Sequence, residues 1–99
     1  MKKTPELQQM LQQIVDARTR KERWDIGLAA ARSVYNHNDA TGDRTDCREL
    51  VRAIYDAFKT GHQSYRLTKD DAWHVVLQAT VLAYSDYMTL AGAKVGGVA

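Results

Sequence analysis

The sequence predicts an all-α protein: a small single-domain bundle of about four helices, the first two of which merge into one in an alternative interpretation. Apolar residues recur with the helical period along most of the chain, and no segment alternates as a bounded strand does. The single proline is Pro5, and glycine is sparse before the last eight residues. At 99 residues with 44% hydrophobic and 26% charged side chains, the chain has the composition of one globular domain.

The first helix is predicted to begin at Pro5. Thr4 is a residue type that caps helix N-termini, and proline is favoured at the first helical position because no hydrogen bond is lost there. One apolar face then follows the helical period. Its members are Leu7, Met10, Leu11, Ile14 and Val15.

Residues 18–24, "RTRKERW", form the junction to the second helix. Because no glycine or proline interrupts the chain here, one helix over residues 5–37 is the alternative, and heptad spacing is compatible with it. That helix would be about 50 Å long, which exceeds a compact domain of this size. Thr19 followed by Glu22 is also the pattern of a capping box, which marks a helix start. We therefore expect a break near residues 18–21.

The second helix is predicted over about residues 20–36. The segment "NHNDATGD" is then predicted to be a loop, because asparagine, aspartate and glycine favour turns.

A third helix is predicted over about residues 45–59, with Gly61 as its C-cap. One apolar face of this helix includes Cys47, which is therefore expected to be a buried, unreactive thiol. The other members are Leu50, Val51, Ile54, Tyr55 and Phe58.

The last helix is predicted to begin at "LTKDD", where Thr68 and Asp71 form an acidic variant of the capping box. It is apolar on nearly all sides, so we expect it to be central to the bundle or at an oligomer interface. Residues 1–92 form the predicted domain, and residues 93–99 are expected to be a frayed tail. Aromatic residues and methionine are enriched at interfaces, although packing within the monomer would account for them equally well. The candidate interface residues are Trp73, Tyr84, Tyr87 and Met88.

Composition limits the compartment and the kind of partner. The net charge of +2 is too small to indicate a polyanionic partner by itself, but residues 1–24 hold six Lys/Arg against three Asp/Glu. A single cysteine cannot form an internal disulfide and suits a reducing compartment. The N-terminus lacks an apolar signal core, and no apolar segment resembles a membrane span. We therefore expect a cytoplasmic protein without a membrane partner.

Motifs that carry catalytic or metal chemistry do not occur in the sequence. It contains no glycine-rich phosphate loop, no G-x-S-x-G and no H-E-x-x-H. His37, His62 and His74 share no ligand spacing and have no paired cysteine. The "NHNDATGD" loop fails the EF-hand pattern because its last ligand position would be the cationic Arg48. The sequence therefore predicts a non-enzymatic protein with no metal and no cofactor.

The basic cluster Arg18, Arg20, Lys21 and Arg23 is the main candidate binding site. It could contact phosphates, contact a protein, or only face solvent. Cations at a helix start oppose the helix dipole, which is a mild indication of function. Trp24 begins an apolar stripe, so we expect the cations to point outward and a triple alanine substitution of the last three to leave the fold intact.

The predicted function is binding to another macromolecule. The favoured interpretation is a small regulator, inhibitor or adaptor that contacts another protein and forms a homodimer through its last helix. Size, the lack of catalytic motifs and the surplus of apolar helix surface favour it. The alternative is a nucleic-acid-binding accessory protein that uses the basic cluster between Arg18 and Arg23.

Overall fold

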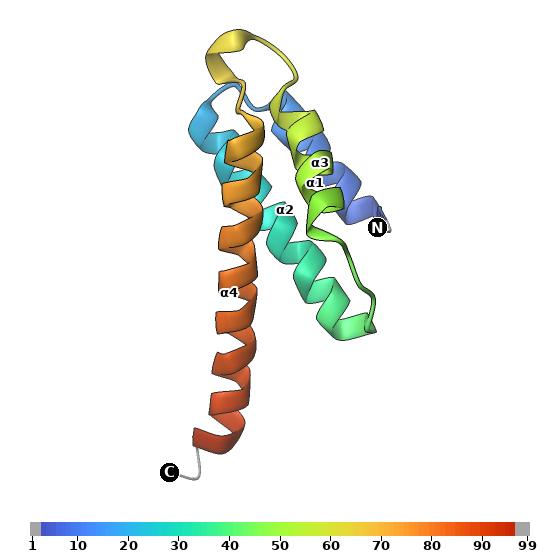
Figure 1. The fold of residues 1–99 in the computed structure, drawn as a ribbon, viewed down its shortest axis with the longest axis vertical. Helices are drawn as coiled ribbons and strands as arrows, with labels where there is room; N and C mark the ends of the chain where they lie inside the picture. The colour runs from blue at the N-terminus through green and yellow to red at the C-terminus, as the bar shows by residue number, and fades with distance from the viewer. Residues whose placement is uncertain (1–2, 97–99) are drawn as a thin grey trace.

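The chain folds into four α-helices, as the computed structural model shows (Figure 1). The structure describes residues 3–96, with side chains up to residue 85; no strand occurs in this part, and about 80% of the chain is helical. The predicted all-α bundle is therefore confirmed. The elements in chain order are α1 (Pro5–Asp16), α2 (Arg20–Thr41), α3 (Cys47–Phe58), the short 3₁₀ helix η1 (Gln63–Tyr65) and α4 (Lys69–Gly96).

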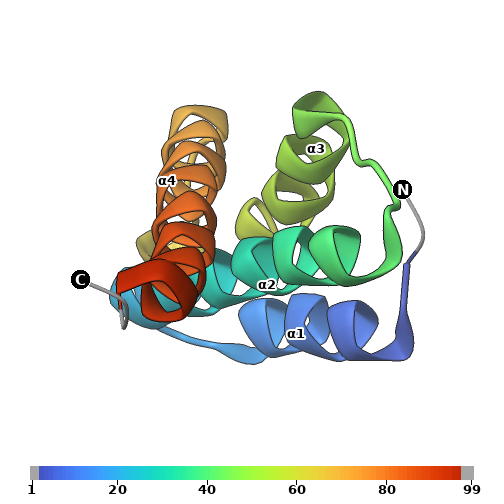
Figure 2. The same cartoon turned by 90° about the horizontal axis from the view of Figure 1, so that it is seen from below.

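Helix α2 is the centre of the arrangement. In Figure 2, α1 lies along one side of α2, while α3 and α4 lie on the other. The helices approach each other closely at Gly27, where an added Cβ would lie 2.7 Å from Cζ of Phe58. Since the Phe58 ring is itself fully buried, a side chain at position 27 would have no room. Other fully buried core residues are Ile14, Leu50, Ile54, Val75 and Val76.

Local capping explains where α1 and α2 begin. Thr4 Oγ1 accepts a hydrogen bond from the backbone N–H of Leu7 at 3.1 Å. Thr19 Oγ1 accepts one from the N–H of Glu22, also at 3.1 Å, so the chain breaks between α1 and α2 as predicted. These bonds satisfy donors that a helix start otherwise leaves unpaired.

The predicted capping box is present at the start of α4, with both of its reciprocal hydrogen bonds formed. Thr68 Oγ1 accepts from the N–H of Asp71 at 3.1 Å, and the Asp71 carboxylate accepts from the N–H of Thr68 at 2.8 Å. The carboxylate also lies at the positive end of the helix dipole. The first turn of α4 is therefore positioned by its own sequence.

The predicted loop "NHNDATGD" is wrong over its first six residues, because α2 continues through Thr41. The side chains that favour turns are satisfied without breaking the helix: Thr41 Oγ1 donates to the carbonyl of His37, and Asn38 donates to Thr45 Oγ1. Gly42 ends α2 in the left-handed conformation, with φ of 78°. The connection to α3 is thus only residues 42–46.

The boundaries of α3 and α4 also differ from the prediction. The C-cap of α3 is Lys59 and not Gly61, although Gly61 has a φ of 93° in the turn that follows. Helix α4 continues through Gly96, past the point where the sequence predicts a frayed tail to begin; residues 97–99 lie outside the described part. Within residues 3–96, no helix combines the length and apolar character needed to cross a bilayer.

The expectation of a buried thiol at Cys47 is wrong. Cys47 is the first residue of α3 and is exposed, because the apolar face of the helix enters the core only from Leu50 onward. Its Sγ lies 3.4 Å from the hydroxyl of Tyr35 on α2. The contact joins the exposed start of α3 to the partly buried ring of Tyr35.

The ionisation of Tyr35 is expected to make the free energy of unfolding decrease at alkaline pH. Burial, aided by the Cys47 contact, raises the pKa of Tyr35 to about 12. An unfolded tyrosine titrates near pH ~10. The folded state holds this proton more tightly, so its stabilisation is complete below pH ~10 and is lost as pH rises toward about 12. In urea titrations, we expect the unfolding free energy to fall more steeply over this window in the wild type than in Tyr35→Phe. Equal slopes would contradict the assignment.

Candidate functional site

Arg23, a member of the predicted binding cluster, lies in the interior of the protein. Its relative exposure is 0%. Nε donates to the carbonyl of Ala17 at 2.8 Å, and Nη2 donates to the carbonyl of Val15 at 2.9 Å. On the other side, Nη1 reaches the carbonyls of Phe58 at 3.1 Å and Thr60 at 2.6 Å. One guanidinium therefore joins the end of α1 to the end of α3.

The physical reason for this contact is the chemistry of helix C-termini. The last carbonyls of a helix have no intrahelical donor and carry partial negative charge, which a cation stabilises. Neither α1 nor α3 has a basic residue in its own last turn. Arg23 supplies the positive charge to both, with the Tyr65 ring 4.7 Å from the guanidinium carbon. Burial lowers the pKa of Arg23, and the nearby charge of Arg66 adds to this, while Tyr65 opposes it.

The prediction that the whole basic cluster faces solvent is therefore wrong for Arg23. The remaining three cations, Arg18, Arg20 and Lys21, are exposed at the junction of α1 and α2. Lys21 pairs with Asp25, with Nζ 3.5 Å from the carboxylate. No sequence signal indicated the inward arginine, because its acceptors at Phe58 and Thr60 lie far from it along the chain.

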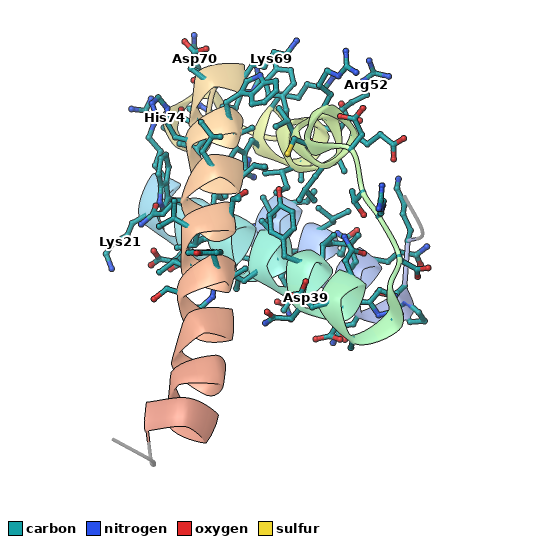
Figure 3. All side chains as sticks on the ribbon, turned by 60° about the horizontal axis from the view of Figure 1, so that its bottom comes forward. Lys21, Asp39, Arg52, Lys69, Asp70 and His74 are labelled. Atoms are coloured by element: carbon teal, nitrogen blue, oxygen red, sulfur yellow. The ribbon has the colours of Figure 1, made fainter. Side chains whose placement is uncertain are left out.

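The exposed cations do not gather on one surface. Lys21 and Arg52 point to opposite sides of the molecule in Figure 3. Arg48, one helical turn before Arg52, pairs with Asp46 at 3.2 Å. Extended recognition of a nucleic-acid backbone needs cations aligned along one face, and Lys21 and Arg52 do not share a face.

Helix α4 presents an apolar face to solvent. Leu77, Val81 and Tyr84 are 54%, 66% and 65% exposed. Their spacing of four and three residues places them on the same side of the helix. The opposite side of α4 is fully engaged in the core through Ala72, Val75, Val76, Ala79 and Ala83. Large apolar side chains that are contiguous and exposed are uncommon in monomers and mark interaction surfaces.

The predicted interface residues differ in their exposure to solvent. Tyr84 belongs to the exposed face, whereas Trp73 is partly buried against the core. The side chains of Tyr87 and Met88 lie outside the described residues. The prediction omitted Leu77 and Val81, although their spacing from Tyr84 was readable as one helical stripe. The apolar α4 face is hereafter Leu77, Val81 and Tyr84.

A half-open cavity of about 780 Å³ lies between the start of α1, the second half of α2 and residues 43–45. Its charged lining residues are two cations, Arg32 and Arg44, and two acids, Glu6 and Asp43. His37 also lines it, with Nε2 3.4 Å from the Asp43 carboxylate. The formal charges of these four residues cancel. Among the described residues, no three His, Cys, Asp or Glu side chains gather as metal ligands would.

Comparison of the chain with protein-family models, with curated proteins and with solved structures gave no match.

Proposed function

We propose that this protein is a non-enzymatic regulator, inhibitor or adaptor that binds a helix of a partner protein on the apolar α4 face. The observation that carries the proposal is the exposure of Leu77, Val81 and Tyr84, each more than half exposed on one side of α4. Anchors one helical turn apart are the pattern by which helices dock on each other.

Burial of this face would contribute favourably to association. Fully burying a leucine or valine side chain contributes roughly 1.5–3 kcal/mol relative to full exposure. Leu77 and Val81 are 54% and 66% exposed, so each would contribute a fraction of that figure. Tyrosine is enriched at interfaces because its ring buries a large area while its hydroxyl stays hydrated. Up to Ala83, the opposite side of the helix is buried in the core, which holds this part of α4 in place and limits the ordering entropy that opposes binding.

The nucleic-acid alternative has less support. Arg23 is used inside the fold, Lys21 has an acidic partner, and Arg52 points away from the junction. Only Arg18 and Arg20 of the original four cations remain exposed without an acidic partner among residues 3–85. Two cations would neutralise too few phosphates for strong binding.

Affinity capture from a lysate of the source cells, with and without nuclease treatment, tests the proposal. Three baits are compared: the wild type, Leu77→Glu with Val81→Glu, and Gln78→Glu. Gln78 is exposed beside the apolar α4 face, so its substitution is a control that adds one negative charge to the same helix outside that face. We expect a protein partner retained by the wild type and by Gln78→Glu but lost by the double variant. Capture that is abolished by nuclease, or unaffected by the double variant, would refute the proposal.

A further inference from the structure

The apolar α4 face has the register of a coiled-coil seam. From Leu77, steps of four and three residues lead to Val81 and Tyr84. Because α4 remains helical to Gly96, the same alternation continues through positions 88, 91 and 95. Those positions hold Met88, Ala91 and Val95, so the seam is apolar from Leu77 to Val95. A helix with such an apolar seam pairs with another helix that carries an apolar seam of the same spacing.

The charge distribution favours a second copy of this chain as the occupant. Between residues 72 and 93, Asp86 is the only aspartate, glutamate, lysine or arginine. The seam therefore carries no charge pattern that would choose a different partner over its own copy. Positions 77, 81, 84 and 88 are complementary to themselves under a two-fold axis, as the interface of a homodimer requires.

The ends of α4 decide the direction of pairing. Lys69, Asp70 and Asp71 lie in its first turn, with a net charge of −1, and Lys94 lies near its end. Antiparallel pairing places the acidic end of each copy beside the basic end of the other and opposes the two helix dipoles. Parallel pairing would bring like charges together at both ends.

The shape of the molecule agrees with this direction. Figure 1 shows the second half of α4 projecting past the other helices, and the longest dimension is 53 Å against 24 and 20 Å for the others. In an antiparallel pair, the projecting half of each α4 lies along the bundled half of its partner. The two bundles then occupy opposite ends of the pair and do not compete for space.

We propose that the protein forms an antiparallel homodimer through α4, with the two-fold axis between Val81 and Tyr84. Val81 of each copy then faces Tyr84 of the other, and Leu77 faces position 88. Toward the ends of the pair, positions 91 and 95 face the exposed residues His74 and Asp70. This inference rests on the proposed function, since it names the partner of the same face. Helix α4 has 28 residues, about 42 Å at the usual rise, and is about 10–12 Å wide. Such a strip lies at the lower end of specific interface sizes, so the dimer is reversible.

Sedimentation measures the first consequence. At tens to hundreds of micromolar, we expect the wild type and Gln78→Glu to approach the dimer mass with concentration. Leu77→Glu with Val81→Glu should stay monomeric, with a dissociation constant raised at least about tenfold, because each copy would carry two charges into the seam. Circular dichroism of the variant should match the wild type, since both positions are exposed in the monomer. A wild type that stays monomeric throughout would overturn the inference.

Disulfide trapping measures the direction. In a Cys47→Ser background, Val81→Cys and Tyr84→Cys are made as two separate proteins and oxidised alone and mixed. A disulfide needs Cα atoms about 4.4–6.8 Å apart, so only facing positions link readily. We expect the mixed 81–84 dimer to dominate. Preferential 81–81 and 84–84 links would show parallel pairing, and absence of links in a protein that sediments as a dimer would show another interface; either overturns the inference.

The two proposals fail separately. A strictly monomeric protein that still captures a partner through Leu77 and Val81 would overturn the homodimer and leave the proposed function standing. A dimer that captures nothing further would support the homodimer and reduce the function to self-assembly. Loss of both behaviours would refute the use of this face altogether.

Discussion

Replacing Arg23 with alanine is expected to lower the unfolding free energy by about 3–5 kcal/mol, which is a large share of the stability of a small domain. The guanidinium serves carbonyls at the ends of α1 and α3. Its removal leaves several buried acceptors without donors, each costing roughly 1–3 kcal/mol unless water enters. It also leaves a void where the largest fully buried side chain stood. Urea denaturation followed by circular dichroism measures the loss.

Two further variants identify the cause. Arg23→Lys keeps the charge but places its donors on one nitrogen, which cannot reach both helix ends, so we expect most of the loss to remain. Arg20→Ala with Lys21→Ala removes two exposed cations and should change stability by within about 0.5 kcal/mol. The triple alanine variant that the sequence predicts to be harmless should therefore be unstable, entirely because of Arg23. Wild-type stability of Arg23→Ala would contradict the tertiary role.

Ile54→Ala is expected to lower the unfolding free energy by about 2–5 kcal/mol. Ile54 is 0% exposed on α3, between the equally buried Leu50 and Phe58. Truncation removes apolar contacts and leaves a cavity that the surrounding side chains fill only in part. Arg52→Ala, on the exposed side of the same helix, is the matched control and should have little effect. A loss near zero for Ile54→Ala would show that the apolar stripe of α3 is not core.

The elements that the sequence predicts well are those set by short-range interactions. Thr4, Thr19 and Thr68 each cap a helix through a bond to a residue three positions later. Such bonds lie within one turn, so residue types and spacing are enough to find them. The apolar stripes that define α1 and α3 are equally local, because their period is a property of the helix itself.

The candidate binding face was only partly readable from the sequence. The surplus of apolar residues on α4 was visible, but which side met solvent depended on where α2 and α3 packed. That packing buries Val75, Val76 and Ala79 and leaves Leu77 and Val81 exposed. Residues of similar hydrophobicity one or two positions apart thus acquire opposite environments, a distinction that composition does not contain.

By itself, the sequence determined the helical class, the break between α1 and α2 and the helix starts, because these follow from the local period and capping. Only the tertiary structure decided the position of Arg23, the exposure of Cys47 and the solvent-facing side of α4. The bonds of Arg23 show the reason most directly: its acceptor at Thr60 lies 37 positions away along the chain. From local charge alone, a cation next to three others is predicted to lie on the solvent-exposed surface. Arg23 is buried instead, because its guanidinium binds the carbonyls at the ends of α1 and α3, and neither helix has a basic residue in its last turn.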